Sequence, residues 1–357
     1  MISLKTEDFI KDSIINLIPY KVNEIGHNNS LKLDANESNY ILGKAIKRRY
    51  ANFIKDTLIN LYPDSSSKKL LNILEKLYGI KSKNFIFGNG SDELISIILL
   101  SLRKDVAVNI PSPSFSMYDI IARYNDLNTN FIKLDKKSFD LPANMASRQN
   151  IYLKNIYFFS YPNNPTGNHF NDGIIKKLLE NKNNIVVIDE AYLFFSDKKS
   201  FIQYITEYDN LIVLKTFSKI GLAGLRFGML FAGDNLINEF KKIKLPYNIN
   251  SLTLSSIEFF LNNFNEFDKN IKKTVSQRNK LYSVFKKIDF ILPYPSDANF
   301  ILIKLNDKKL KNKFDEFLKN NNIIIRNFTG NMGLFYRITI GTALQNKKLI
   351  GYLESFH

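Results

Sequence analysis

Residues 211–228 read LIVLKTFSKIGLAGLRFG, two apolar runs joined by a polar turn and a glycine-rich loop. The apolar runs are typical of buried strands. Between them lies Lys219, and Thr216, Ser218 and Arg226 supply donors around it. A lysine in this position can form a Schiff base with a carbonyl cofactor, and hydroxyl and guanidinium donors suit a phosphate. A surface lysine beside an ordinary glycine turn is the alternative.

Short apolar runs of this kind recur through the first two thirds of the chain and alternate with segments of helical period. The runs are 85–87, 106–110, 131–134, 156–160, 185–188, 211–214 and 227–231, and the helical segments include 92–104, 116–124 and 172–181. Alternation of strands and helices favours a mostly parallel sheet covered by helices. We therefore predict an α/β fold with a seven-stranded sheet in a large domain.

After about residue 250 the pattern changes to long helical stretches rich in lysine and asparagine. Strands are predicted at 299–305, near 323–326 and at 336–340, with a helix at 308–320. This pattern indicates a smaller α+β domain. The predicted division is an N-terminal arm with part of the small domain at 1–42, the large domain at 43–255 and the C-terminal small domain at 256–357. The arm carries one short predicted helix and is expected to pack against the C-terminal part or another subunit.

Polar loops follow several of the predicted strands. They are GNGSDE after Phe87, PSPSFS after Ile110, YPNNPTGN after Ser160, DEAY after Ile188 and KTFSK after Leu214. In open α/β sheets ligands bind at the carboxyl ends of the strands. The loops are therefore expected to meet in one site.

Each of these loops has a functional and a structural interpretation. Asp189 ends a fully apolar strand, where a carboxylate must be paired, either in a structural ion pair or with a cationic cofactor ring. Amides around Gly90, Ser91 and Asp92 open a helix and could bind phosphate, although Asp92 also suits a helix cap. Asn164 is either part of an Asn–Pro turn or an amide donor to a ring oxygen.

Composition excludes several classes of protein. The chain has 357 residues and a formal net charge of +16, with no cysteine and three histidines. A disulfide scaffold, an iron–sulfur cluster and a cysteine nucleophile are excluded, and no metal site is expected. Because the lysines are scattered in pairs, neither nucleic acid nor a membrane is an expected partner, and small anionic substrates are favoured. The N-terminus lacks the apolar segment of a signal peptide, so a cytoplasmic protein is expected.

Taken in order, NPTG from Asn164, DEAY from Asp189, Ser218–Lys219 and Arg226 resemble the fold-type I pyridoxal-phosphate (PLP) enzymes of the class I/II aminotransferase family. Similar motifs occur along nearly the whole chain: PYK at 19–21, LDANES at 33–38, LYPD at 61–64, GNGSDELI at 88–95, PSFSMY at 113–118, PYNINSL at 246–252, ANFILI at 298–303, IIIRN at 323–327 and RITIGT at 337–342. The resemblance implies the fold-type I architecture and PLP as cofactor.

The same resemblance implies transamination of a small phosphorylated amine, most simply histidinol phosphate, with 2-oxoglutarate as the amino acceptor that becomes glutamate. Two alternatives stay open: a transaminase of another amino-alcohol phosphate, and a decarboxylase of phosphoserine or phosphothreonine on the same fold. A PLP-binding regulator without activity is a third class, but the chain has no added DNA-binding segment.

By resemblance, the catalytic residues are Lys219, Asp189, Tyr192 and Asn164. Lys219 would hold PLP as a Schiff base and then act as general base and acid. Asp189 would pair with the ring nitrogen, and Asn164 and Tyr192 would bond the ring 3′-oxygen. Tyr118 would stack on the ring face.

The resemblance also assigns the two anionic ends of the site. The cofactor phosphate would be held by Gly90, Ser91, Asp92, Thr216, Ser218 and Arg226. Tyr62 would reach that phosphate from a neighbouring subunit, which implies a homodimer with shared sites. Arg326 and Arg337 would bind the phosphate or carboxylate of the substrates, since a guanidinium recognises both anions. Tyr20 and Asn36 would line the substrate end.

Overall fold

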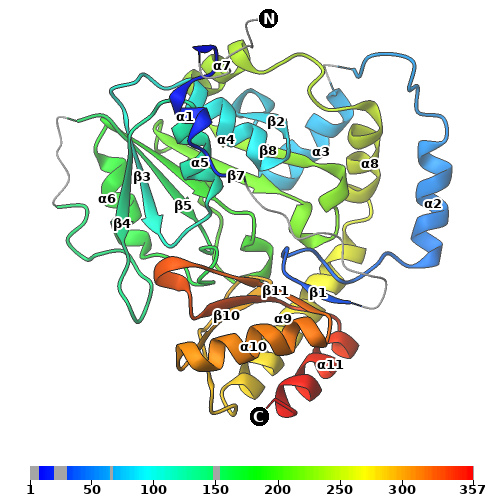
Figure 1. Ribbon diagram of the computed structural model, residues 1–357. Helices are drawn as coiled ribbons and strands as arrows, with labels where there is room; N and C mark the ends of the chain where they lie inside the picture. The colour runs from blue at the N-terminus through cyan, green and yellow to red at the C-terminus, as the bar shows by residue number, and fades with distance from the viewer. Residues whose placement is uncertain (1–7, 20–29, 65–66, 148–152, 357) are drawn as a thin grey trace, which may run out of the picture.

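Two sheets organise the chain in this computed structural model, which describes residues 8–19, 30–64, 67–147 and 153–356. The large sheet has seven strands and the small sheet has five. Figure 1 shows the large sheet, surrounded by its helices, in the upper part of the view and the small sheet below it.

The large sheet contains all seven predicted strands. In spatial order they are β2 (Phe85–Asn89), β8 (Phe227–Ala232), β7 (Leu211–Thr216), β6 (Asn184–Asp189), β5 (Asn155–Ser160), β3 (Ala107–Ser112) and β4 (Thr129–Lys133). The two antiparallel pairs, β2–β8 and β8–β7, both involve β8, and the other four pairs are parallel. The predicted mostly parallel seven-stranded sheet is confirmed.

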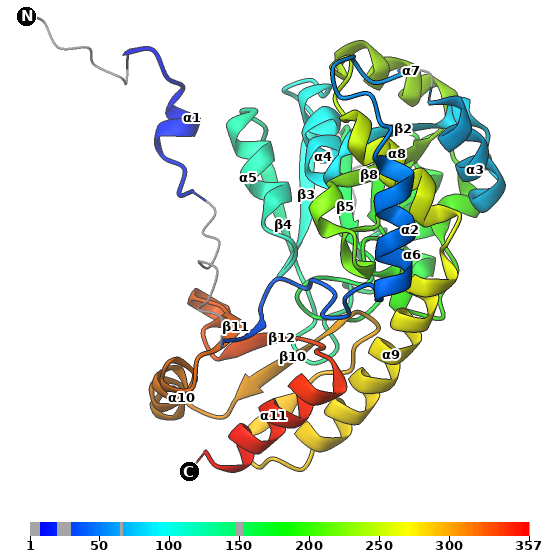
Figure 2. The same ribbon diagram turned by 90° about the vertical axis from the view of Figure 1, so that its right-hand side faces the viewer.

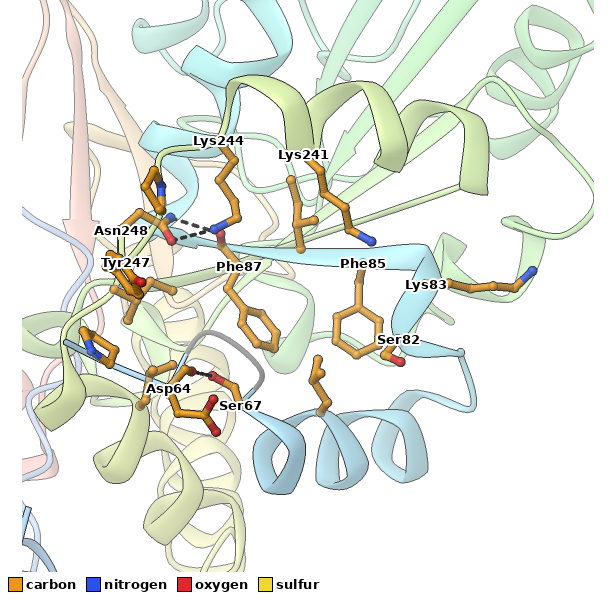
Figure 3. A pocket seen from close by; sticks show the side chains of 16 residues that line it. Asp64, Ser67, Ser82, Lys83, Phe85, Phe87, Lys241, Lys244, Tyr247 and Asn248 are labelled. Carbon is orange, nitrogen blue, oxygen red and sulfur yellow. Dashed lines mark hydrogen bonds between the residues drawn. The ribbon is translucent and has the colours of Figure 1, made fainter. Parts of the chain in front are cut away.

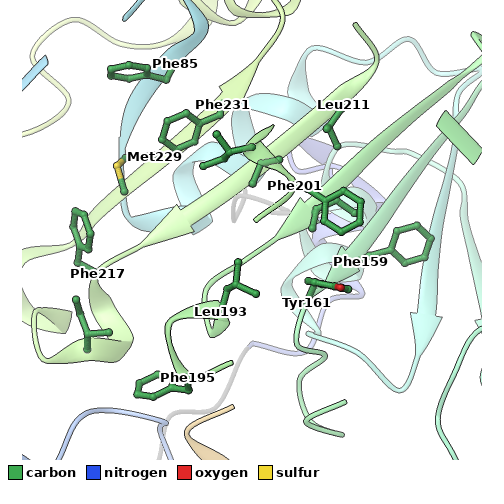
Figure 4. Packing of buried hydrophobic residues seen from close by; sticks show 14 of the residues in the cluster. Phe85, Phe159, Tyr161, Leu193, Phe195, Phe201, Leu211, Phe217, Met229 and Phe231 are labelled. Carbon is green, nitrogen blue, oxygen red and sulfur yellow. The ribbon is translucent and has the colours of Figure 1, made fainter. Parts of the chain in front are cut away.

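Helices cover both faces of this sheet because its strands are apolar on both sides. In β7, Leu211 and Val213 join one apolar cluster while Ile212 and Leu214 join the other. One cluster packs under α4 (Gly90–Leu100), α5 (Met117–Tyr124) and α7 (Asp234–Ile243). The other packs under α2 (Lys44–Ile54), α3 (Lys68–Tyr78), α6 (Asp172–Glu180) and α8 (Ser251–Leu261). Figure 2 shows α4 and α5 on one side of the strands and α3 and α8 on the other, and Figure 4 shows aromatic packing in the second cluster.

The small sheet combines segments from both ends of the chain. Its order is β1 (Leu31–Leu33), β11 (Ile323–Asn327), β12 (Phe335–Thr339), β10 (Phe300–Leu305) and β9 (Ile291–Pro293). The helices α9 (Asn265–Phe285), α10 (Lys308–Asn320) and α11 (Ala343–Glu354) belong to the same C-terminal part. Because β1 pairs in parallel with β11, the N-terminal segment packs against the C-terminal part, as predicted.

Several local predictions need correction. The N-terminal part holds a strand, β1, in addition to the short helix α1 (Asp12–Ile15), and β9 was also missed. The helix predicted at 92–104 is α4, which begins at Gly90 and ends at Leu100. The next residue, Ser101, bonds the carbonyl of Ile98 with its hydroxyl, a local bond that competes with helix continuation.

The predicted division at 42/43 and 255/256 stays a prediction, and α8 runs through its second boundary. Of the helices in the described ranges, none combines the length and the apolar character that a membrane span needs.

Candidate active site

A cavity lies where β5, β6 and β7 end, and it collects most of the predicted site residues. Those that line it are Ser91, Asp92, Asn164, Asp189, Tyr192, Thr216, Ser218, Lys219 and Arg226. Parallel strands present their carboxyl ends at one edge of a sheet, which explains why loops distant in sequence meet here. The terminal nitrogen of Lys219 lies 5.7 Å from the centre of the Tyr192 ring.

Asp189 ends β6 and is almost fully buried. The hydroxyl of Tyr118 donates to its Oδ2 at 2.8 Å, and the backbone N–H of Ala191 donates to its Oδ1 at 3.1 Å. Burial raises the pKa of the Asp189 carboxyl to about 6, although both donors and the charge of Lys219 oppose that rise. A buried carboxylate is costly without a cationic partner, so a cation in the cavity would stabilise its ionised form.

The loops that carry Asp189 and Lys219 are tied together by a buried ion pair. Lys215, in β7, lies 2.7 Å from Glu190, and both side chains are buried. Glu190 also accepts bonds from the hydroxyl of Ser200 and the backbone N–H of Phe201. With its oxygens satisfied in this way, the pair holds the ends of β6 and β7 at a defined spacing.

Tyr192 connects residues of both sheets. Its hydroxyl accepts bonds from the side-chain amides of Asn36 at 2.9 Å and Asn164 at 3.4 Å. The amide oxygen of Asn164 accepts from Nη1 of Arg337 at 2.6 Å. Asn36 follows β1 and Arg337 lies in β12, so the small sheet contributes polar groups beside the cavity of the large sheet.

The opposite end of the cavity is rich in donors. The hydroxyls of Thr216 and Ser218 lie 2.8 Å apart, and the guanidinium of Arg226 lies 3.0 Å from Asp92. No side chain caps the start of α4, which leaves first-turn amides available to an anion. Gly90 has a φ of +78°, a left-handed backbone conformation that favours glycine, and it lies close to the guanidinium of Arg226.

The prediction that Tyr118 stacks on a ring in the cavity is not supported by its position. Its side chain is fully buried, stacks on Phe158 with ring centres 5.0 Å apart, and is absent from the cavity lining. Phe115 lines the cavity instead. The reason is local: Phe115 precedes α5 at the strand end, whereas Tyr118 lies in the first turn of α5 and points back to the sheet.

Phe115, Ser160 and Ala191 line the cavity but were not predicted. Each lies within four residues of a predicted site residue in the sequence. Proximity in sequence was therefore the available signal, and side-chain direction was the missing information.

Some predicted residues lie away from the cavity lining. Tyr62 is 80% exposed and stacks on Tyr247 with ring centres 4.6 Å apart. Arg326 pairs in register with Arg337 across β11 and β12, which places the two side chains on the same face of the small sheet. Tyr20 lies outside the described residues.

A larger pocket lies beside α3 and the segment that follows α7 (Figure 3). Phe85 and Phe87 form part of its wall, and the ammonium of Lys244 donates to the amide oxygen of Asn248 at 2.9 Å. None of the predicted catalytic or cofactor-binding residues lines it. On chemical grounds the smaller cavity is therefore the candidate active site.

Comparison with known proteins agrees with this geometry. Residues 28–353 match the family model described as aminotransferase class I and II. A histidinol-phosphate aminotransferase of Vesicomyosocius okutanii is 39% identical over 92% of this chain and 92% of its own. One from Pyrococcus furiosus is 36% identical over 97% of this chain and 98% of its own. The crystal structure of histidinol-phosphate aminotransferase from Sinorhizobium meliloti, in complex with pyridoxal-5'-phosphate, has a TM-score of 0.85 against this chain, with 19% identity and 98% coverage of both chains. By family model, by sequence and by fold, this chain belongs to the class I and II aminotransferases.

Proposed function

We propose that this protein is a PLP-dependent aminotransferase that acts on histidinol phosphate, with 2-oxoglutarate as amino acceptor. Relatives that carry the histidinol-phosphate aminotransferase name are 36% and 39% identical over nearly the whole chain, which supports this substrate. The observation that carries the proposal is a single cavity lined by both Lys219 and the buried Asp189.

The residues present fit PLP at both of its ends. Burial disfavours the charge of Asp189 in the protein alone, and a protonated pyridine nitrogen is the cationic partner that would reverse this. The first-turn amides of α4, with Thr216, Ser218 and Arg226, would hold the phosphate. When bound, PLP supplies an electron-accepting ring that stabilises a carbanion at the substrate carbon.

Each remaining residue has a role that its contacts support. Lys219 would hold the cofactor covalently. Once released, it would carry the proton between the substrate carbon that bears the amine and the aldehyde carbon of the cofactor, since it is the amine in the cavity lining. Asn164 and Tyr192, already hydrogen-bonded to each other, would orient the ring by its oxygen. Phe115, rather than Tyr118, would cover the ring face.

Arg337 and Arg326 would bind the anionic group of each substrate in turn. They are direct neighbours across two antiparallel strands, so one anion could contact both guanidinium groups. Arg337 also donates to the amide oxygen of Asn164, which lines the cavity, and to the backbone carbonyl of Asp34, so its guanidinium is held beside the cavity lining.

Replacing Arg337 by alanine is expected to raise KM for both histidinol phosphate and 2-oxoglutarate by about 10-fold to 100-fold, the value of a lost charged hydrogen bond. Steady-state kinetics with each substrate varied in turn would measure this. Arg123→Ala, at an exposed arginine on α5, is the matched control and should leave both constants unchanged. An effect on one substrate alone would contradict a shared anion site.

The substrate is tested by incubating the holoenzyme with histidinol phosphate, phosphoserine, phosphothreonine and other amino-alcohol phosphates, each with and without 2-oxoglutarate. Mass spectrometry should show glutamate, and a carbonyl in place of the donor amine, only when 2-oxoglutarate is present. Carbon dioxide released from phosphoserine or phosphothreonine without an oxo acid would overturn the proposal in favour of a decarboxylase.

We also propose that the protein is a homodimer. Exposed apolar side chains gather on two segments that meet at the stacked pair of Tyr62 and Tyr247: Leu58, Ile59 and Leu61 on one, Leu245 and Leu252 on the other. An exposed apolar surface of this kind marks an interaction site. Tyr62, which does not line the cavity of its own chain, would then serve the cavity of the partner. The cytoplasmic location stays a prediction.

A further inference from the structure

The phenol of Tyr118 is held in place before any ligand binds. Its ring is stacked on Phe158 at 5.0 Å and meets Phe115 edge-on at 5.4 Å, and no part of the side chain reaches solvent. A ring packed on two sides has little rotational freedom left. Its hydroxyl therefore occupies one position, 2.8 Å from Oδ2 of Asp189.

Resting on the proposed function, we infer that Tyr118 is a positioning residue. It keeps the Asp189 carboxylate oriented and ionised, so that the carboxylate would anchor the cofactor ring nitrogen and stabilise its protonated form. Asp189 has two oxygens, and each has one donor: Tyr118 on Oδ2 and the Ala191 backbone on Oδ1. These two bonds fix the plane of the carboxylate. A carboxylate has about four lone-pair sites, so it can accept a third bond from the ring nitrogen.

Burial and the charge of Asp189 make the Tyr118 hydroxyl the donor, and the Asp189 carboxylate the acceptor, in the hydrogen bond between them. Burial, and next the charge of Asp189, hold the pKa of Tyr118 well above its ordinary value, so the phenol keeps its proton. Burial raises the pKa of Asp189, Asp92 raises it further, and Lys219 lowers it together with the two donors. Tyr192 is the other titratable group that influences Tyr118. Among the described residues, Tyr118 is the one whose side chain donates a hydrogen bond to Asp189.

This role differs from the stacking role that the resemblance implied. A stacking residue must line the cavity. Phe115 lines it, whereas Tyr118 does not and contacts the Phe115 ring edge-on. Tyr118→Phe separates the two roles, because it keeps the ring and removes only the hydroxyl. If the ring were what mattered, this variant would behave as the wild type does.

The test uses cofactor labelled with ¹⁵N at the ring nitrogen, bound to the full chain. Tyr118→Phe is expected to weaken PLP binding by about 10-fold to 100-fold, the value of a hydrogen bond to a charged group. It should also shift the ¹⁵N resonance toward the unprotonated ring at a pH where the wild type is protonated. Tyr336→Phe is the matched control, since it removes a buried tyrosine hydroxyl that donates to Asp315 at 2.5 Å in the small sheet. The control should lose some thermal stability and leave both cofactor readouts unchanged.

Wild-type PLP affinity and ring protonation in Tyr118→Phe would overturn the inference, and so would an equal change in Tyr336→Phe. Failure of the wild-type protein to bind PLP would instead refute the proposed function. The two failures are therefore distinguishable within one experiment.

Discussion

Lys219→Ala is expected to abolish transamination while the protein still binds PLP without a covalent bond. The proton transfer that a general acid–base group provides is worth about 10²-fold to 10⁴-fold, and loss of the covalent tether adds to this. Lys219 is the amine that lines the cavity, beside the ring of Tyr192. The measurement is single-turnover kinetics, together with borohydride reduction and peptide mapping, which should label Lys219 in the wild type and no lysine in the variant.

The matched control is Lys241→Ala, because this lysine is exposed on α7 and lies outside the cavity lining. It should keep full activity and be labelled at Lys219 as the wild type is. Activity retained in Lys219→Ala would refute the assignment.

Mixing Lys219→Ala with Tyr62→Ala, each nearly inactive alone, should restore activity if the proposed dimer shares its sites, because one cavity of the mixed dimer would then be intact.

Asp189→Asn is expected to lower kcat by at least about 10²-fold, the usual cost of losing one buried electrostatic group at a reacting centre. The neutral amide cannot stabilise a protonated ring nitrogen, so PLP should bind more weakly and with its nitrogen unprotonated. Ring protonation by ¹⁵N resonance and kcat measured at saturating PLP would test both effects. Asp315→Asn, which alters another carboxylate bonded by a buried tyrosine, is the control. Wild-type kcat in Asp189→Asn would contradict the proposed pairing.

The same substitution makes a prediction for the cofactor-free protein. Burial raises the pKa of Asp189 from 3.8 to about 6, so between these values the folded state holds a proton that the unfolded state has lost. Stability contributed by this residue is therefore present below pH 4 and lost as the pH rises through 6, by roughly 3 kcal/mol. The difference in unfolding free energy between wild type and Asp189→Asn should change by this amount across that window, and should be flat above it. A flat difference throughout would show that Asp189 is not held in a desolvated site.

The strands could be predicted because parallel strands buried on both faces leave continuous apolar runs. In β5 every residue from Asn155 to Ser160 is buried. In the C-terminal part, helix α10 has the predicted bounds of 308–320. The short strands β1 and β9 were missed since three residues carry too little pattern, and the partner of β1 lies far along the chain. Pairing across such a separation is a tertiary event.

By itself the sequence determined the kind of chemistry: one lysine after a buried strand, one carboxylate at the end of another, and donors suited to a phosphate at the start of a helix. Those features are local, because strand ends and helix starts are set by neighbouring residues. Only the tertiary structure decided which of two aromatic residues in PSFSMY faces the cavity and which lies behind it, bonded to Asp189. It also decided that Arg326 and Arg337 stand side by side. Both depend on side-chain direction and strand register, which are set by packing between segments that are distant in the chain.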